Sequence, residues 1–446
     1  MKKILISFPV KSYYLEFKNV ICFLLKKDYQ LGIILSWLDS ETEEIAKLLR
    51  MDCQVFLPPK ELCYIDMTNE KKRGNEKQNK YQIFLKDFLT TIRAKSYVKK
   101  IIKDFSPDFL FQGPFHSVCK IDNFLLNFKN AELKKLCFSY SSYAGKKVKL
   151  TSFKNRIKEN SIPKAYGVKY SLINRLVSFF LKRWIISLRS QSYFIFPPHF
   201  IIISLITNSS IKAPKRQPQK MYDRYYAFNN MQKKILIDDG IPESKILVAG
   251  IPRLDDVYSL FEKNKLKKFY KNLSLKFNQK YVIYNVNPLW EHNVKSRKFH
   301  FDLLNSHFDI LKNKKIKIII SLHPLCDISD YVYLESNTNT TISRKYNIYE
   351  LYPFASFVLS HRCSTNILSL TFNKKVLISD PMNLFSNLEY QETFEMYKLD
   401  TVILTRNLLE YDEKFNSLYN DLKDDKHSKI KIKRASSLIS NDLQTL

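Results

Sequence analysis

Two stretches decide the fold: residues 318–324, IIISLHP, and residues 356–380, SFVLSHRCSTNILSLTFNKKVLISD. Each contains an apolar run that ends at a polar cluster, and in the second stretch a Ser-Thr pair then opens an apolar-periodic segment. In an open parallel α/β sheet, this arrangement puts His323 and the pair Ser364 and Thr365 at the carboxyl ends of strands, where such sheets bind ligands. It also directs a helix amino terminus into the same crevice, which suits a phosphate.

The remaining sequence alternates strand-like and helix-like segments. Strands are expected at residues 4–8, 31–36, 54–57, 109–112, 136–139, 224–228, 246–249, 281–285, 316–322, 357–359 and 376–379. Helices are expected at residues 15–25, 41–49, 81–105, 172–189, 229–239, 299–311, 366–372, 410–422 and 432–438. This alternation predicts parallel, doubly wound sheets. We expect an α/β protein with two Rossmann-like domains, residues 1–260 and 261–446, that face each other across a cleft, with the lysine-rich residues 263–280 joining the halves.

The composition is that of a globular protein with an unusually basic balance. The chain has 446 residues, 45% of them hydrophobic, and a formal net charge of +30, which invites a nucleic-acid or anionic-membrane partner. Only 7 residues are glycine, where average usage gives about 30. Abundant Lys, Asn, Ile, Phe and Tyr beside scarce Gly are typical of AT-rich codon usage, which raises the lysine content without any function attached.

The cysteines and the amino terminus bear on the cellular compartment. The seven cysteines are odd in number, widely spaced and without a CxxC pair, so neither a zinc site nor a disulfide framework is predicted. Reduced thiols in a cytoplasmic protein are expected. The apolar run after Lys2 and Lys3 is too short for the core of a signal peptide and is interpreted as the first strand.

Residues 146–224 form a basic insert, with 17 Lys and Arg against 2 acidic residues. Within it, residues 172–189 are expected to form one helix, on which Arg175, Lys182 and Arg189 recur every seventh residue and share a face. An apolar helix with such a basic stripe can lie in an anionic membrane interface. A core helix with a solvated basic face is the alternative. No run of 18 apolar residues occurs, so a spanning helix is not predicted.

Several side chains are candidates for binding a phosphate. His323 can donate a hydrogen bond from the end of its strand, although a histidine satisfied within a loop is the alternative. His361 and Arg362 add donors and positive charge beside the helix that Ser364 is expected to cap, with Thr365 following it. An ordinary capped helix would show the same pattern.

A second candidate segment follows the expected strand at residues 246–249. Gly250 permits a sharp exit from that strand, and Arg253 can then neutralise a phosphate or pair with Asp255 or Asp256. The nearby run Asp238-Asp239-Gly240 is interpreted as a helix end with a left-handed glycine, not as an acidic catalytic motif.

Two residues of the first domain are candidate general bases, Glu16 near the start of the first helix and His116 after an expected strand. A packing or capping role is the alternative for each. No glycine pattern fits a phosphate-binding loop or a dinucleotide fingerprint, no His or Cys spacing suits a metal, and no GxSxG elbow is present.

With these residues identified, the chain resembles the GT-B glycosyltransferase-like proteins of bacterial surface polysaccharide synthesis. The similar families are the surface carbohydrate (capsule or O-antigen) biosynthesis proteins, the CDP-glycerol glycerophosphotransferases, and the non-hydrolysing UDP-N-acetylglucosamine 2-epimerases that share the fold. The resemblance rests on residues 2–25, 233–258 (KKILIDDGIPESKILVAGIPRLDDVY), 281–293 (YVIYNVNPLWEHN), 321–324 (SLHP) and the segment through Asp380.

The resemblance implies that His323, Ser364 and Thr365 contact the nucleotide phosphates. The sequence departs from the family pattern at two positions. Asn366 stands where a small residue or glycine often follows the threonine, and Ser369 stands about where a glutamate tends to hold the ribose. The basic insert has no counterpart in the family.

The resemblance further implies a GT-B fold whose carboxyl-terminal domain binds a nucleotide donor and whose amino-terminal domain binds the acceptor. The expected reaction is transfer of a sugar or a polyol phosphate to a surface glycan or lipid-linked acceptor, without metal or cofactor, at the inner face of the plasma membrane. The positive and hydroxyl-bearing candidates would stabilise the departing phosphate, and Glu16 or His116 would accept the proton of the acceptor hydroxyl.

Two alternatives remain at this point. A nucleotide-sugar epimerase or hydrolase of the same fold would use the same phosphate site without a glycan acceptor. A basic nucleic-acid-binding protein is supported only by the net charge, because no aromatic RNA-binding signature or zinc finger is present. Nucleic acid is therefore not expected as a partner.

Overall fold

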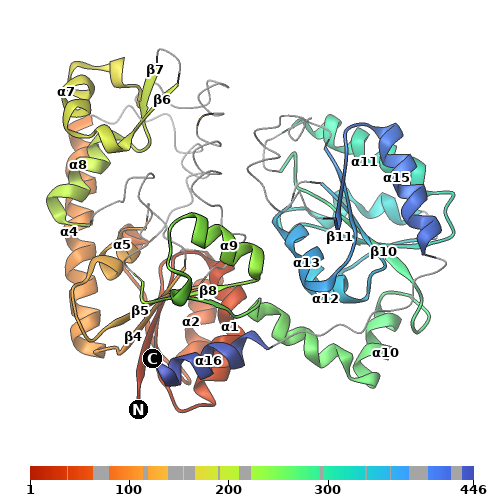
Figure 1. Ribbon diagram of the computed structural model, residues 1–446, viewed down its shortest axis with the longest axis horizontal. Coiled ribbons are helices and arrows are strands. Elements are labelled where there is room, and N and C mark those ends of the chain that lie inside the picture. The colour runs from red at the N-terminus through yellow and green to blue at the C-terminus, as the bar shows by residue number, and fades with distance from the viewer. Residues whose placement is uncertain are drawn as a thin grey trace. The chain divides into compact units, whose positions relative to one another are not determined.

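The computed structural model divides the chain into two units (Figure 1). The first contains Met1–Pro252 and Arg434–Leu446, and the second contains Arg253–Lys433. The structure describes residues 1–37, 39–63, 80–113, 119–138, 154, 166–188, 191–209, 222–291, 295–336, 339–361, 363–380, 400–422 and 434–446.

A seven-stranded parallel sheet lies at the centre of the first unit, in the order β3-β2-β1-β4-β5-β8-β9. Its strands are β1 (Lys3–Phe8), β2 (Gln30–Leu35), β3 (Gln54–Phe56), β4 (Phe109–Gln112), β5 (Lys134–Phe138), β8 (Arg224–Ala227) and β9 (Ile246–Val248). The chain proceeds outward from β1 in one direction through β2 and β3, and in the other direction from β4 onward. The sheet is therefore doubly wound, as the sequence predicts, with its switch point between β1 and β4.

The described helices of the first unit are α1 (Lys11–Leu25), α2 (Thr42–Leu49), α4 (Lys80–Phe105), α5 (Lys120–Asn127), α7 (Leu172–Phe180), α8 (Pro198–Thr207), α9 (Asn230–Asp238) and α16 (Ala435–Thr445). In α1, Phe17, Val20, Ile21 and Leu24 are buried at the spacing of one helix face. The expected helix end after α9 is confirmed: Gly240 has φ 86° and donates its N–H to the carbonyl of Ile237 at 2.7 Å.

Close packing of α4 on the first sheet depends on Gly32 in β2. A Cβ atom at this position would lie 3.0 Å from the ring of Phe105 and 3.1 Å from the side chain of Leu5. Those distances are shorter than ordinary van der Waals contacts, so the end of α4 approaches the strand because glycine has no side chain. The core beneath α4 and α5 contains Leu5, Ile34, Val98, Ile102, Phe105, Leu110 and Leu125.

The C-terminal helix α16 belongs to the first unit, where it packs beside α1 (Figure 1). The side chain of Asp442 in α16 accepts hydrogen bonds from Nε of Arg224 at 2.8 Å and from the hydroxyl of Tyr226 at 2.9 Å. This division differs from the expected boundary at residue 260, and it removes residues 434–446 from the expected second domain. Both differences arise from packing between residues that are far apart in the sequence, which the local spacing of apolar residues cannot reveal.

The expected helix at residues 172–189 is wrong beyond its first half. Helix α7 ends at Phe180, a 3-10 turn follows at Lys182–Trp184, and β6 (Ile185–Leu188) then pairs antiparallel with β7 (Gln191–Phe194). Adjacent β-branched isoleucines at 185 and 186 favour a strand. Arg175 and Lys182 are both exposed but do not lie on one helix, and Arg189 lies outside the described residues.

A six-stranded parallel sheet forms the second unit, in the order β12-β11-β10-β13-β14-β15. The strands are β10 (Tyr281–Asn285), β11 (Lys317–Ser321), β12 (Thr340–Ile342), β13 (Val358–Ser360), β14 (Val376–Ser379) and β15 (Val402–Thr405). This sheet is also doubly wound, and its switch point lies between β10 and β13. The predicted pair of parallel α/β domains is confirmed by the two sheets.

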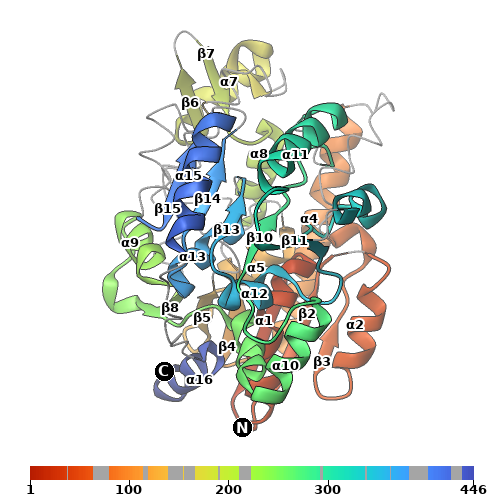
Figure 2. The same ribbon diagram turned by 90° about the vertical axis from the view of Figure 1, so that its right-hand side faces the viewer.

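The described helices of the second unit are α10 (Lys263–Asn272), α11 (Arg297–Leu311), α12 (Ile348–Leu351), α13 (Leu368–Phe372) and α15 (Leu408–Asp421). Figure 2 shows α15 lying along β14 and β15, and Tyr411 and Phe415 of this helix are part of the core. The lysine-rich residues 263–280, expected to join the halves, instead contain α10 and lie within the second unit. Phe269 and Tyr270 of α10 are buried, which accounts for the helix.

Candidate functional site

The candidate site lies at the carboxyl edge of the second sheet, at its switch point. Strands β10 and β13 are neighbours, and Asn285 pairs with Ser360 in the sheet register as the last residue of each strand. The chain leaves β10 and β13 toward helices on opposite sides of a doubly wound sheet, and this is the position at which such sheets generally bind ligands. Both fold-deciding stretches of the sequence end at this edge.

Neutral polar groups converge at the switch point. Nδ2 of Asn285 donates to Oγ1 of Thr365 at 3.0 Å and lies 3.5 Å from Oγ of Ser360. Sγ of Cys363 is 3.0 Å from the same threonine hydroxyl. Because Thr365 is partly exposed, its hydroxyl can still meet a ligand. The structure thus brings the predicted Thr365 together with Asn285, which sequence reasoning placed in a strand but did not nominate as a site residue.

The backbone around Thr365 differs from the expected capped α-helix. Residues Ser364–Ile367 form a 3-10 turn that precedes α13, and Cys363 occupies the N-cap position without a side-chain capping bond. Asn366, at a position where the sequence resemblance implies a small residue, is fully buried, and its Nδ2 donates to the carbonyl of His361 at 2.9 Å. The asparagine therefore fixes the loop after β13. Arg362 lies outside the described residues.

The structure places His361 in the core, which corrects its expected role as a phosphate donor. The ring is 3% exposed. Its Nδ1 is 3.3 Å from the carbonyl of Ser379, and its Nε2 is 3.4 Å from the hydroxyl of Tyr284. Burial lowers its pKa to about 4, so the ring is neutral at neutral pH. His361 therefore supports the loop from behind and does not face a ligand.

A second buried histidine accompanies it. His307 of α11 stacks on His361 with ring centroids 5.3 Å apart, and its Nδ1 is 2.7 Å from the Tyr284 hydroxyl. Burial, and then the neighbouring His361, hold the pKa of His307 well below its ordinary value. Two neutral imidazoles and one phenol thus form a rigid support under β10 and β13, without adding charge.

His323 stands at the same edge, after β11. Because β11, β10 and β13 are consecutive in the sheet, its strand lies about 10 Å from β13. His323 is partly exposed, and its Nδ1 accepts the N–H of Leu325 at 3.2 Å. That bond leaves the proton of the neutral ring on Nε2, the form that can donate to an anion.

Two further predicted positions lie elsewhere in the second unit. The guanidinium of Arg253 stacks on the ring of Tyr349, 4.4 Å from its centroid. Gly250, just before it, has φ 94°, which confirms the sharp exit from β9. Ser369, which lies about where the sequence resemblance implies a ribose-binding glutamate, is fully buried and contacts Thr401 at 3.4 Å. It therefore supports the core and is not placed to hold a ribose.

A carboxylate network that sequence reasoning missed also lies beyond β10 and β11. The hydroxyl of Tyr331 donates to Oε1 of Glu291 at 2.6 Å and is 2.9 Å from Nε2 of His300. Burial lowers the pKa of His300, with Glu291 acting against that shift. Oε2 of Glu291 is buried without a hydrogen-bond partner among the described residues. The sequence did contain a clue to this network, because Glu291 belongs to the segment YVIYNVNPLWEHN that carries the family resemblance.

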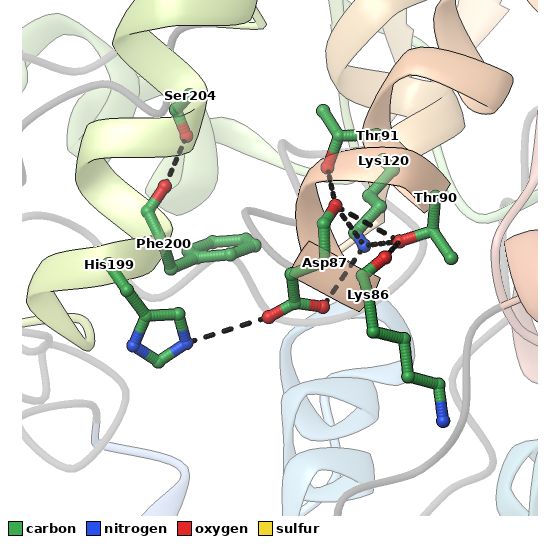
Figure 3. A network of polar contacts seen from close by, with 8 residues as sticks. All are labelled: Lys86, Asp87, Thr90, Thr91, Lys120, His199, Phe200 and Ser204. Carbon is green, nitrogen blue, oxygen red and sulfur yellow. Dashed lines mark hydrogen bonds and ion pairs between the residues drawn. The ribbon is translucent and has the colours of Figure 1, made fainter. Parts of the chain in front are cut away.

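In the first unit, a charged network joins three helices (Figure 3). Nζ of Lys120 in α5 is 3.2 Å from Oδ1 of Asp87 in α4, and Nε2 of His199 in α8 is 3.5 Å from Oδ2 of the same carboxylate. Burial raises the pKa of Asp87, but the hydrogen bond from His199 and the charge of Lys120 outweigh it and leave the pKa below its ordinary value. Because Lys120 opens the helix after β4, this network lies at the carboxyl edge of the first sheet.

Of the two predicted general bases, the structure describes Glu16 but not His116. Helix α1 begins at Lys11, so Glu16 lies in its second turn and not at its start, and its side chain is 6% exposed. His116 lies outside the described residues. Their catalytic roles stay predictions. The partly exposed His199, held by Asp87, is a further group that can accept a proton.

One buried carboxyl lies near the switch point of the first sheet. Oδ1 of Asp122 in α5 accepts the hydroxyl hydrogen of Ser7 in β1 at 2.6 Å, and its backbone carbonyl accepts from the amide of Gln112 in β4 at 3.1 Å. Burial raises the pKa of Asp122 to about 7. Through its side chain and its backbone carbonyl, Asp122 therefore joins α5 to the two central strands.

The described part of the chain adds three observations on metals, cysteines and membranes. It contains no group of three or more His, Cys, Asp or Glu side chains that could hold a metal ion. All seven cysteines lie within it and are unpaired with one another. Its helices include none that is both long enough and apolar enough to cross a bilayer.

Known proteins are similar to this chain in fold. No family model and no curated sequence matches it. The UDP-GlcNAc 2-epimerase of Neisseria meningitidis, bound to UDP-GlcNAc, is 13% identical with a TM-score of 0.54, and the alignment covers 100% of both chains. The epimerase of Methanocaldococcus jannaschii is 13% identical with a TM-score of 0.53 and the same coverage.

A glycosyltransferase is similar to the same degree. CalG4, the calicheamicin glycosyltransferase, is 9% identical with a TM-score of 0.54, and the alignment covers 100% of this chain and 94% of CalG4. At such identities the likeness establishes the fold alone. That fold is the GT-B-like pair of parallel α/β domains that the sequence predicts.

Proposed function

We propose that this chain is a nucleotide-sugar-dependent glycosyltransferase, which moves a sugar or a polyol phosphate onto a bacterial surface polysaccharide. The observation that carries the proposal is the convergence of Asn285, Ser360 and Thr365 at the switch point of the second sheet. This is the position where open α/β sheets bind ligands. Structures of the same fold, in complex with UDP-GlcNAc in one case, support the choice of substrate.

The second unit would hold the donor. The Thr365 hydroxyl and the Nε2–H of His323 would donate to phosphate oxygens, with Arg253 adding positive charge. Oε2 of Glu291 would accept a hydrogen bond from a sugar hydroxyl. Glycosyl transfer builds negative charge on the departing phosphate, so fixed donors that strengthen as this charge grows lower the barrier. The rigid support of neutral histidines behind β13 keeps these donors in place, and the proposed step uses no metal.

The first unit would bind the acceptor and supply the base. Glu16 and His116 remain candidates, and the pair of His199 with Asp87 joins them, because a carboxylate that holds one ring nitrogen leaves the other to accept a proton. We place the acceptor, a glycan or a lipid-linked glycan, at the inner membrane face, where the basic insert would meet anionic lipid.

Replacing Thr365 with valine is expected to weaken donor binding at least tenfold, which corresponds to about 1.4 kcal/mol, because it removes one hydroxyl at nearly constant shape. Thermal unfolding is measured with UDP-, CDP-, CMP- and GDP-linked sugars. A donor that binds only the native protein raises its melting temperature. At a donor concentration of 100 Kd, binding stabilises the native protein by about 2.7 kcal/mol.

The matched control is Thr340→Val, at the amino end of β12 in the same sheet, where Oγ1 is buried without a hydrogen-bond partner among the described residues. This variant should bind the donor as the wild type does. Equal donor shifts in wild type and Thr365→Val would remove the site from the switch point. Nucleotide release at the same rate with and without glycan acceptor would favour an epimerase or hydrolase over a transferase.

A further inference from the structure

Helix α7 turns an apolar stripe toward solvent. Leu172, Leu176, Phe179 and Phe180 are 72, 62, 71 and 81% exposed. They follow one another at positions i, i+4, i+7 and i+8, so they share one face of the helix. We call these four side chains the α7 surface. Exposed apolar side chains scattered singly are ordinary, but a continuous patch of this kind marks an interaction site.

The exposure is built into the local fold. The hydroxyl of Ser171 caps α7 by accepting the N–H of Asn174 at 3.0 Å, and Nδ2 of Asn174 donates to the carbonyl of Gly167 at 2.9 Å. Val177, on the other side of the helix, packs against a small core of Leu181, Trp184, Phe194 and Ile201. The helix therefore already has a buried face, and the α7 surface is its second apolar face.

Positive charge surrounds this second face. Residues 166–188 contain four Lys and Arg residues and no acidic residue. Lys169, Arg175 and Lys182 are exposed, and Nζ of Lys182 lies 5.1 Å from the centroid of the Phe179 ring. The ammonium group therefore lies over an aromatic ring of the apolar stripe, in a cation–π contact that joins the positive charge directly to the apolar face.

We propose that the α7 surface inserts into an anionic lipid bilayer and anchors the first unit there. Leucine and phenylalanine would enter the acyl boundary, while the flanking lysines and arginine would meet the lipid phosphates. An anionic bilayer supplies an apolar layer and negative charge side by side, which matches both properties of the surface. Figures 1 and 2 show α7 and the β6–β7 hairpin at the end of the first unit opposite α16.

The membrane contact proposed here differs from the stripe of Arg175, Lys182 and Arg189 on one helix that the sequence predicted. The anchor is a nine-residue helix with an apolar face, and the charges act at its border. It provides the membrane contact that the proposed acceptor calls for, but it involves none of the donor-site residues. Bilayer binding can therefore be tested without any nucleotide sugar, and its failure would leave the donor-site proposal standing.

The test is flotation of the full chain with vesicles of phosphatidylcholine alone or mixed with phosphatidylglycerol. Wild type is expected to float with the anionic vesicles only. Phe179→Ser combined with Phe180→Ser should lower the bound fraction at least tenfold, and Arg175→Glu combined with Lys182→Glu should remove the preference for anionic lipid. The control combines Leu48→Ser with Leu409→Ser, which are 62 and 79% exposed on other helices, and should float as wild type does.

Two results would overturn the proposal. Undiminished flotation of the double phenylalanine variant would show that other basic residues bind the vesicles without α7. Failure of the wild type to float, together with self-association in sedimentation velocity that the phenylalanine variant abolishes, would make the α7 surface a contact between copies of the chain. Circular dichroism confirms that each variant is folded before flotation is compared.

Discussion

Asp442→Ala is expected to destabilise the first unit by about 3–5 kcal/mol, the cost of removing one partner from a buried ion pair. The carboxylate side chain is 7% exposed. It accepts hydrogen bonds from the guanidinium of Arg224 and from the buried hydroxyl of Tyr226. Alanine would leave a partly buried cation and a buried hydroxyl without their acceptor, and would loosen α16 from the sheet.

The measurement is hydrogen exchange in increasing urea, followed at peptides from β1 and β8, because these strands report on the first unit alone. Glu61→Ala is the control, since its ion pair with Arg93 lies at the surface of the same unit. Surface pairs contribute about 0–1 kcal/mol, so this variant should unfold close to the wild-type midpoint. Equal midpoints for the two variants would contradict the role assigned to Asp442.

Asp122→Asn is expected to abolish a loss of stability that the wild-type first unit suffers between about pH 4 and pH 7. Burial raises the pKa of Asp122 from 3.8 to about 7, so the folded state holds this proton more tightly than the unfolded state. Stability is therefore greatest below pH 4, falls as the pH rises toward 7, and is constant above it. The full difference is about 4 kcal/mol at most.

Asparagine resembles the protonated acid, because its carbonyl can still accept the hydrogen bond of Ser7 and it carries no charge. At pH 8 the variant should be more stable than wild type, and at pH 4 the two should be similar, again by hydrogen exchange at β1. The exposed Asp104 provides the control, since Asp104→Asn should keep the wild-type pH dependence. A parallel pH dependence in Asp122→Asn and wild type would refute the assignment.

The second unit must be excluded from this measurement because its buried histidines act in the opposite direction. Burial lowers the pKa of His361 to about 4, so the folded second unit loses stability as the pH falls from the ordinary histidine range toward that value. A probe of global unfolding would mix the two effects, whereas peptides from β1 separate them.

Strands buried on both faces could be predicted from the sequence because they are continuous apolar runs. The bounds of β4, β10 and β14 agree with the expected ranges. β12 (TTI) and β15 (VILT) were not predicted; they are the two edge strands of the second sheet, and each pairs with a single neighbouring strand. The helix at residues 172–189 was wrong beyond Phe180 because the helical spacing of apolar residues continues into a segment where the adjacent isoleucines at 185 and 186 favour a strand.

The candidate site, like the fold, could be predicted from the sequence only in part. The sequence predicted the edge of the sheet and Thr365 within it, because apolar runs that end in polar clusters reveal where strands end. It could not show that the ring of His361 turns inward to Ser379 and Tyr284, or that Asn285 turns toward Thr365. Side-chain direction at the end of a strand depends on the neighbouring strands, and residues 284 and 285 lie more than 70 positions from their partners 361 and 365.

The return of α16 to the first unit has a consequence for synthesis on the ribosome. The second unit is one uninterrupted segment, whereas the first needs residues from both sides of it. Domains generally fold as units in order of synthesis. During translation of this chain, however, β8 and α1 of the first unit stay uncovered by α16 until the whole second unit has been synthesised. The ion pair of Arg224 with Asp442 spans 218 positions, so its closure would be among the last steps of maturation.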